Sequence, residues 1–300
     1  MPFDLKDYFY TMQIELNGII SGLAIALLSV GFQVAYLPTS VFFVGLAGLY
    51  TLAPYIYLAF QSFWGHWYLS VIASIVVVIG LSILFEWANH APLARKHASS
   101  GAHLISSLGI YIVLVQVVAM IWGNDTKNIR VGLDPTFNLG EMVITKSQIL
   151  IVGVSCALLF GFLAILRVTD IGLRLRSLAD NPIQFALFGC NIDMHRLVAF
   201  GIAGLFAANA SLLTAYDSGF DPHSGLPAVL LAIVAIIIGG RNSFAGPIVG
   251  ALILGIIRAQ VVWYFTAWWQ DAITFMALVI FLLLRPYGIL GKKTRIEANI

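Results

Sequence analysis

LNGIISGLAIALLSVGFQVAYLPTS, residues 16–40, opens a stretch that continues to Phe85 without a single Lys, Arg, Asp or Glu. Apolar runs of comparable length then recur almost to the C-terminus. A helix needs about 20 apolar residues to cross the hydrocarbon core of a bilayer, because every backbone N–H and C=O must be paired inside the segment. The chain is therefore predicted to be an all-α, polytopic membrane protein.

The composition supports this class and leaves no room for an appended soluble domain. Of the 300 residues, 60% are hydrophobic and 10% are charged, whereas soluble domains carry about 25% charged residues. We therefore expect one transmembrane domain over residues 1–300. The net charge of +2 gives no reason to expect nucleic acid as a partner. The two cysteines, Cys156 and Cys190, are interpreted as packing residues rather than a disulfide.

Nine apolar segments are predicted to be membrane spans. They lie near residues 13–36, 39–61, 67–86, 104–122, 148–166, 195–216, 226–240, 245–264 and 268–285. The second segment contains Pro54, and the segment near 226–240 is short and is followed by a Gly-rich region, so either one could be broken or re-entrant. Eight full spans plus one partial span are equally compatible with the sequence.

Loop charge predicts the orientation, because Lys and Arg accumulate on the cytoplasmic side. The basic residues concerned are Arg95 and Lys96 in the loop 87–103, Arg167, Arg174 and Arg176 in the loop 167–194, and Lys292, Lys293 and Arg295 in the tail. The loop 217–225 contains Asp217 and Asp221 but no Lys or Arg, so it is predicted to face outward. The loop 123–147 is predicted to lie on the same side, because successive spans cross the membrane in alternating directions. Nine spans then place the N-terminus outside and the C-terminus inside.

A short similarity between two parts of the sequence suggests two inverted repeats. The first span ends in Ala35-Tyr36 and the sixth ends in Ala215-Tyr216, and each is followed by a second apolar segment. Because the second copy is offset from the first by five spans, the two would run in opposite directions, as in transporters built from inverted repeats.

The sequence contains no convincing catalytic or metal site. The six histidines lie near span ends or in loops without metal-ligand spacing, so we interpret them as loop or interfacial residues. Arg258 alone lies well inside a span, where it either lines a water-filled path or snorkels to the surface. Gly291-Lys292-Lys293-Thr294 lacks the earlier glycine and the strand of a phosphate-binding loop. Any ATP must therefore be hydrolysed by another chain.

The loop 167–194 is the most informative of the cytoplasmic segments. Asn181 is suited to cap a helix, Pro182 to its first position and Gly189 to its C-terminal end. These residues predict a helix of two turns whose apolar surface comes from Phe185, Leu187 and Phe188. Such a helix either transmits a movement of a soluble partner to the membrane spans or lies on lipid headgroups.

This loop resembles that of the branched-chain amino-acid ABC importer permeases, whose pattern is roughly G-x-x-x-R-A-x-A-x-(D/N)-x-x-x-A-x-L-x-G-x-N. The matching residues are Gly172, Arg176, Ala179, Asp180, Ala186, Leu187, Gly189 and Asn191. The segment 239–250 is similar to the family's G-G-x-G-S-x-x-G stretch, with Asn242 in place of a glycine. The ending Leu284–Gly291 is similar to LRPxGLFG, and Glu86 with Pro92 is similar to E-R-x-x-x-x-P-L-R.

One difference between this chain and the family pattern bears on which solute is transported. Where family members often have N-F-A-H-G-E, this chain has Val41–Leu46, and only Phe42 and Gly45 match. The polar residues that contact solute or shape the path are therefore absent, and a urea or short-amide permease of the same family stays open. A stand-alone channel or facilitator for a small neutral solute is the alternative from another class.

The resemblance implies a permease subunit in the bacterial inner membrane that lines half of a translocation path. Its implied partners are a second permease, identical or paralogous, two cytoplasmic ATP-binding subunits and an extracytoplasmic solute-binding protein. The implied ATPase-coupling residues are Gly172, Arg174, Arg176, Ala179, Asp180, Asn181, Pro182, Ala186, Leu187, Gly189 and Asn191. The implied path or gate residues are Phe42, Gly45, Gly239, Gly240, Ser243, Gly246 and Gly250, although Gly246-x-x-x-Gly250 is also a helix-packing motif. No cofactor is implied for this chain, because ATP would be bound by the partner subunits.

Overall fold

The computed structural model describes residues 5–130, 132, 134–139, 142–285 and 288–291. Its helices are α1 (Leu5–Thr39), α2 (Gly45–Trp64), α3 (Trp67–Phe85), α4 (Ala91–Arg95), α5 (Ser100–Trp122), α6 (Lys146–Val168), α7 (Asp170–Asp180), α8 (Pro182–Leu187), α9 (Ile192–Ser218), α10 (Gly225–Gly239), α11 (Gly246–Tyr264) and α12 (Gln270–Leu284). A π-helical turn covers Glu86–His90, a 3-10 turn covers Ala267–Trp269, and the strands are β1 (Thr136–Leu139) and β2 (Met142–Thr145). The predicted all-α architecture is confirmed. The basic tail with Lys292, Lys293 and Arg295 lies outside the described residues.

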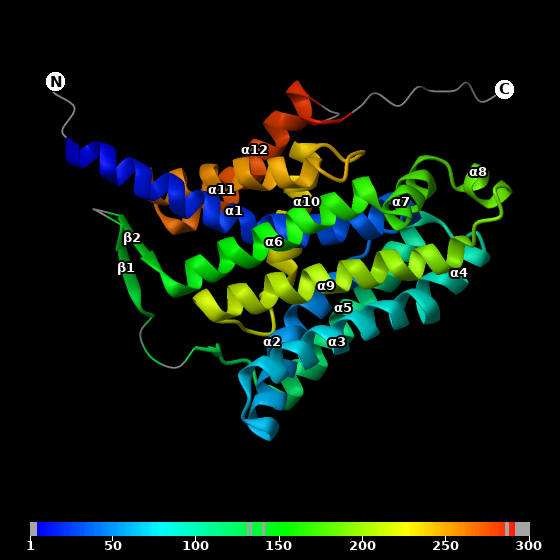
Figure 1. Ribbon diagram of the computed structural model, residues 1–300, viewed down its shortest axis with the longest axis horizontal. Coiled ribbons are helices and arrows are strands. Elements are labelled where there is room, and N and C mark those ends of the chain that lie inside the picture. The colour runs from blue at the N-terminus through cyan, green and yellow to red at the C-terminus, as the bar shows by residue number, and fades with distance from the viewer. Residues whose placement is uncertain (1–4, 131, 133, 140–141, 286–287, 292–300) are drawn as a thin grey trace.

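The centre of the bundle is α1, which packs against α6, α9, α10 and α11. Its most apolar window is 78% buried, compared with 6% for the window that contains α12. The β1–β2 hairpin lies at one end of the bundle, and α4, α7 and α8 lie at the opposite end (Figure 1). The two predicted faces of the membrane protein are therefore separated along the long axis.

Seven helical segments in the described part are long and apolar enough to cross a membrane. They are Thr11–Thr39, Trp67–Arg95, Ser100–Trp122, Lys146–Val168, Ile192–Ser218, Gly246–Tyr264 and Ala267–Leu284. The other two predicted spans are also helices: α10 has only 15 residues, and α2 has 20 residues but contains Pro54. Each predicted span therefore coincides with a helix.

Two predicted boundaries were wrong. The second span begins at Gly45 rather than near 39, because α1 continues through Pro38 and then stops at Ser40, which has φ 54°. The segment 87–103 is not all loop, because a π-helical turn joins α3 to α4 and keeps the chain helical to Arg95. Pro92 comes just after this π-helical turn and is the second residue of α4.

The hairpin was not predicted from the sequence. Its strands are antiparallel, with Thr136 opposite Thr145 and Leu139 opposite Met142. Thr145 also begins α6 through a capping box, because its hydroxyl accepts from the N–H of Gln148 while the Gln148 side chain accepts from the N–H of Thr145. The hairpin thereby fixes where α6 starts.

The arrangement of α1, α2, α9 and α10 is the one that the inverted-repeat hypothesis predicts. The helices α1 and α9 run in opposite directions (Figure 1), and each is followed by a short non-helical break and a shorter helix. The beginning of α10 packs closely on α2, since a Cβ on Gly225 would collide with the Ala47 carbonyl and the Thr51 hydroxyl. The starts of the two shorter helices therefore meet inside the bundle.

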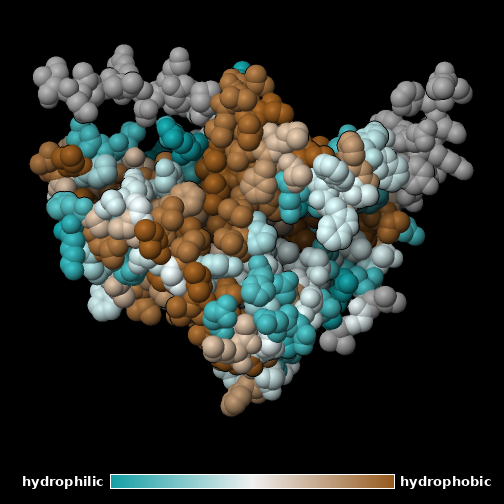
Figure 2. Space-filling view, turned by 180° about the vertical axis from the view of Figure 1, so that it is seen from behind, coloured by the Kyte–Doolittle hydropathy of each residue, from teal (hydrophilic) through white to brown (hydrophobic). Residues whose placement is uncertain are grey.

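The surface shows an apolar belt. In Figure 2 hydrophobic residues cover the upper middle of the face in view, and hydrophilic residues gather toward its two sides and over its lower part. Exposed aromatic side chains lie where α2 meets α3 and where α11 meets α12, at Phe63, Trp64, Trp67, Tyr264 and Trp268. Aromatic residues concentrate at the level of lipid headgroups, so these junctions mark one edge of the belt.

Candidate functional site

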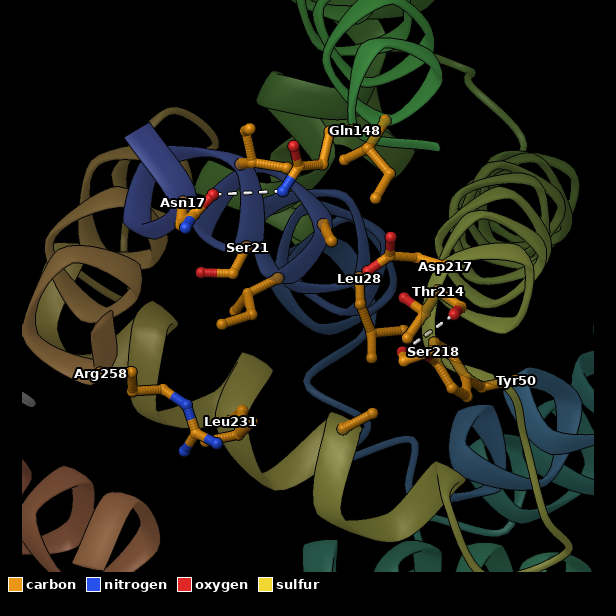
Figure 3. A pocket seen from close by; sticks show the side chains of 15 residues that line it. Asn17, Ser21, Leu28, Tyr50, Gln148, Thr214, Asp217, Ser218, Leu231 and Arg258 are labelled. Atoms are coloured by element: carbon orange, nitrogen blue, oxygen red, sulfur yellow. Dashed lines mark hydrogen bonds between the residues drawn. The ribbon is translucent and has the colours of Figure 1, made fainter. Parts of the chain in front are cut away.

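A cavity of about 400 Å³ opens between α1, α2, α6, α9, α10 and α11. Its polar lining residues are Asn17, Ser21, Tyr50, Gln148, Thr214, Asp217, Ser218 and Arg258. The side chains of Ile20, Leu28 and Leu231 contribute aliphatic surface to the same cavity (Figure 3). We call it the outer cavity, because α6 begins beside it and α9 ends beside it, at the hairpin end of the bundle.

A network of polar residues holds the rim of the outer cavity together. The Gln148 amide donates to Asn17 Oδ1 at 3.1 Å and so joins α6 to α1 (Figure 3). The Ser147 hydroxyl, one residue earlier, lies 2.6 Å from Asp134 Oδ2 and 2.7 Å from Asp217 Oδ1. The hairpin region, α6 and α9 therefore meet at one hydroxyl group.

Asp134 is the anchor of this network and is ionised. Burial alone would raise its pKa, but hydrogen bonds from the Ser147 hydroxyl and N–H, together with the nearby Arg130 guanidinium, hold the pKa below the ordinary Asp value. The Arg130 ion pair measures 3.1 Å. Hydrogen bonding to the charged form of a carboxylate favours that form, so Asp134 carries negative charge next to Asp217.

Arg258 lines the outer cavity and does not extend freely to the surface. Its guanidinium donates to Asp271 Oδ1 at 2.9 Å, to Thr274 Oγ1 at 3.2 Å and to Gln270 Oε1 at 3.2 Å. All three partners belong to α12, and the Arg258 side chain is 17% exposed. Arg258 therefore lines a cavity and is held by α12, and a role in a water-filled path stays a prediction.

A second hollow, of about 700 Å³, lies at the opposite end of the bundle, and we call it the inner groove. It is formed by the ends of α1 and α6, by α7 and by the turn 242–245. Of the residues implied by the resemblance, Arg176, Ala179, Asp180 and Ser243 line it.

Gln33, near the C-terminal end of α1, ties that helix to the turn between α10 and α11. Its amide donates to the Arg241 carbonyl at 2.5 Å and to the Ser243 carbonyl at 3.3 Å, and its side chain is fully buried. Neither the outer cavity nor the inner groove includes Gln33 in its lining. The packed layer between the two hollows is therefore held by side-chain-to-backbone hydrogen bonds.

The segment 167–194 contains the predicted short helix and one more. Asn181 caps α8 as predicted, accepting from the N–H groups of Ile183 (3.0 Å) and Gln184 (3.1 Å). Gly189 has φ 76°, the left-handed conformation that ends helices. The preceding helix α7 was not predicted; its Gly172 packs on Leu166 with no room for a Cβ. Asn191 caps α9 in the same manner, through the N–H of Met194.

The residues that give α8 its exposed apolar surface differ at one position from those predicted. Ile183, Leu187 and Phe188 are 75%, 81% and 85% exposed and form an apolar patch. Phe185 does not contribute to it, because its ring is buried and contacts His195 edge-on at 5.1 Å between ring centres. The apolar patch therefore contains Ile183 where Phe185 was predicted.

The predicted gate glycines form the contact between α10 and α11. A Cβ on Gly239 would collide with the Gly246 carbonyl, one on Gly250 with the Ala235 carbonyl, and Gly240 has φ 120°. The Phe42 ring contacts Phe32 at 5.1 Å. The Gly45 N–H donates to Ser107 Oγ at 2.7 Å. These residues do not line the outer cavity, and their role in gating stays a prediction.

Four ionisable residues form a buried cluster that sequence reasoning missed. Glu86 Oε1 and Arg196 Nε lie 2.5 Å apart, and the two side chains are 0% and 10% exposed. His90 and His103 face each other with 3.4 Å between their Nδ1 atoms. The interpretation of these two histidines as loop or interfacial residues was wrong, because the extended helix from α3 to α4 carries His90 into the core. Only the resemblance of the stretch at Glu86 to a family motif pointed to this region.

A bundle with seven helical segments long and apolar enough to cross a membrane, among the residues that the structure describes, is the architecture of a polytopic membrane protein. The sequence family described as "Branched-chain amino acid transport system / permease component" matches residues 14–282, and the chain belongs to that family. It is a family of transport permeases rather than of enzymes, and the chain is a multi-pass inner-membrane protein.

Two relatives of this class and one solved structure are similar to the chain. It is 30% identical to the permease protein BraD of Pseudomonas aeruginosa over 226 aligned residues. The aligned region covers 73% of this chain and 73% of BraD. It is 26% identical to the permease protein LivH of Escherichia coli, with 96% of this chain and 97% of that protein covered. Both relatives are described as parts of high-affinity branched-chain amino acid transport systems. PsaBC from Streptococcus pneumoniae shares the fold, with a TM-score of 0.52, 13% identity and coverage of 90% and 91%.

Proposed function

We propose that this chain is the permease subunit of an ATP-driven ABC importer for branched-chain amino acids or a related small polar solute. The observation that carries the proposal is the exposed apolar patch of α8, which follows the helix α7 and precedes the bundle helix α9. A short capped helix of this kind is suited to dock on a soluble subunit. Phe185 packs on His195 of α9, so a displacement of α8 would reach the bundle.

The proposed assembly contains four further subunits. A second permease would complete the path, two ATP-binding subunits would contact α7 and α8, and a solute-binding protein would deliver the solute to the outer cavity. The exposed side chains of Arg174 and Arg176 are available for acidic groups on the ATP-binding subunits. The orientation with the N-terminus outside and the C-terminus inside places the outer cavity toward the binding protein.

The first test is co-purification. The chain, tagged at its N-terminus and extracted gently from its native membrane, should bring two ATP-binding chains and a second permease, identified by mass spectrometry. A homo-oligomer without any ATPase, under conditions that preserve other ABC complexes, would instead support a channel or facilitator.

The second test concerns α8 directly. Leu187→Glu places a charge in the proposed docking face, and an unpaired charge buried in an interface is strongly unfavourable. Solute uptake and solute-stimulated ATP hydrolysis should both be lost while the bundle stays folded. Val168→Glu is the matched control, because Val168 is 85% exposed at the end of α6 but lies outside α8. Equal uptake in the two variants would favour a helix that lies on lipid headgroups.

A further inference from the structure

The inner groove is lined mainly by apolar side chains, with two arginines among them. The apolar residues come from α1, α6, α7, the turn 242–245 and the C-terminal segment 288–291, and they include Leu37, Leu163, Leu166, Leu173, Phe244 and Leu290. The arginines are Arg167, in the last turn of α6, and Arg176 of α7. A hollow of about 700 Å³ that is mostly apolar and basic at two points matches an amphipathic anion.

Both guanidinium groups of the groove are without a carboxylate partner among the described residues, since neither belongs to an ion pair. The recorded hydrogen bond of Arg176 runs from Nε to the Gly172 carbonyl at 3.3 Å, so its terminal N–H groups remain for a ligand. Asp180 also lines the groove but pairs with neither arginine, and the lining keeps a net positive formal charge. Arg174 lies outside the lining and stays available to the ATP-binding subunits.

The turn 242–245 adds neutral donors to the same wall. Ser243 Oγ accepts from the N–H groups of Ala245 and Gly246, both at 3.3 Å, so the hydroxyl keeps its own proton for another acceptor. The Asn242 amide lines the groove as well. Phosphate oxygens accept hydrogen bonds from guanidinium, hydroxyl and amide groups. The polar part of the inner groove is therefore suited to a phosphate group.

The inner groove borders the part of α6 that faces lipid. Phe160, Ile165 and Val168 are 69%, 44% and 85% exposed, whereas Leu163 and Leu166 of the same helix line the groove. The arginine of α6 is one residue from the end of that helix, where a span leaves the hydrocarbon core. A free phosphate or a carboxylate side chain would leave the apolar wall uncovered. The acyl chain of a phospholipid covers this wall and reaches it directly from the bilayer.

We propose that the inner groove binds an anionic phospholipid of the cytoplasmic leaflet, with its phosphate between Arg167 and Arg176 and an acyl chain along Leu166 and Phe244. Basic pockets between transmembrane helices on the cytoplasmic side bind anionic headgroups. The leaflet follows from the predicted orientation, and the binding itself requires neither a solute nor an ATP-binding subunit. The bound lipid would join the end of α6 to α7 and to the turn 242–245.

The test measures lipid binding to the full chain in neutral detergent by native mass spectrometry. Dioctanoyl phosphatidylglycerol should bind more tightly than dioctanoyl phosphatidylcholine, which has the same chains and phosphate but also a choline cation. Arg167→Gln and Arg176→Gln should each weaken phosphatidylglycerol binding by at least about tenfold. Asp180→Asn removes the negative charge of the lining and should strengthen binding by about two- to fivefold.

Arg285→Gln is the matched control, because Arg285 is exposed just after α12, at the same end of the bundle, but lies outside the groove lining. It should leave phosphatidylglycerol binding unchanged. The arginines concerned are all exposed, so the variants should keep the melting temperature of the wild type. Glycerol 1-phosphate has no acyl chain and should compete at least about a hundredfold less well than the lipid.

The outcomes that overturn the inference differ from those that overturn the importer function. If Arg285→Gln weakens binding as much as Arg176→Gln, or if phosphatidylcholine binds equally well, the lipid covers a basic surface without a specific site. If glycerol 1-phosphate competes as well as the lipid, the groove binds a phosphate group alone. If the isolated chain retains phosphatidylglycerol but the complex with ATP-binding subunits does not, the groove belongs to that protein interface. A complex that retains the lipid but imports no solute would remove the importer function and leave the inference standing.

Discussion

Glu86 and Arg196 form an ion pair of 2.5 Å that is buried between the end of α3 and the start of α9. Removing one partner leaves an uncompensated charge in a low-dielectric site, which costs about 3–5 kcal/mol in buried pairs. We therefore expect Glu86→Gln to lower the free energy of unfolding by about that amount. The measurement is denaturation of the purified chain in detergent. Unfolding is monitored as the loss of the helical signal.

The matched control is an ion pair in the same part of the molecule that is exposed. Arg95 and Asp193 lie 2.7 Å apart, but their side chains are 68% and 49% exposed. Exposed pairs contribute about 0–1 kcal/mol, so Arg95→Gln should change stability little. If the two variants were equally stable, burial would not be what makes the Glu86 pair important.

Single residues were predicted unevenly from the sequence, and the reason is physical. Asn181 and Gly189 were placed correctly, because capping depends on residues within one turn of the chain. The Glu86–Arg196 pair and the Asp217–Ser147 contact join positions 110 and 70 residues apart, and no local pattern encodes such pairings. The role of Arg258 stayed open for the same reason, since its partners are on another helix.

The contact between α10 and α11 depends on glycine. A Cβ on Gly250 would meet the Ala235 carbonyl and the Gly239 nitrogen, so Gly250→Ala must separate the helices or distort them. Overpacking of this kind costs about 1–3 kcal/mol. We expect a corresponding loss in thermal stability in detergent, together with reduced uptake if the contact moves during transport.

Gly153 in α6 provides the comparison. Open space surrounds a Cβ at Gly153, and replacing a glycine by alanine inside a helix gains about 0.5–1 kcal/mol. Gly153→Ala should therefore stabilise the chain slightly. A destabilisation equal to that of Gly250→Ala would mean that helix packing is not what requires Gly250.

The hairpin and the start of α6 should depend on pH through Asp134. Its pKa is held below the ordinary Asp value by Ser147 and Arg130 in spite of burial, so its ionised form stabilises the fold. That contribution is complete above the unfolded value of about 3.9 and is lost as the pH falls through the lower, folded pKa. The difference in melting temperature between the wild type and Asp134→Asn should therefore be constant near neutral pH and shrink below about pH 4. A difference that stays the same down to pH 3 would contradict the ion pair and hydrogen bonds as its source.

Long helices were predicted from the sequence more reliably than short helices and strands. Each of the nine predicted spans is a helix, because 20 apolar residues have few alternatives in a bilayer. The start of α2 was misplaced because the chain stays apolar across the break at Ser40, where hydropathy carries no signal. The hairpin and α7 were missed because strands of four residues and a polar helix of 11 residues have no apolar run to reveal them.

The two hollows of the molecule lie at opposite ends of the bundle. Both are lined in part by α1 and α6, but the outer cavity also involves α2, α9, α10 and α11, whereas the inner groove also involves α7 and the turn 242–245. Gln33 lies between them and holds α1 to that turn. The structure thus has a packed layer between the two hollows, and Gln33 contributes hydrogen bonds to it.

The orientation of the whole molecule can be tested with its own cysteines. Cys190 lies between α8 and α9 on the side predicted to be cytoplasmic, and Cys156 lies in α6. In a Cys156→Ala background, a membrane-impermeant maleimide should label Cys190 in inside-out vesicles and leave it unlabelled in right-side-out vesicles. With both cysteines replaced by alanine, His223→Cys should show the reverse pattern, because His223 is exposed in the acidic loop predicted to face outward. Labelling of both positions from the same side would contradict nine crossings, and an exchange of the two patterns would place the outer cavity toward the cytoplasm.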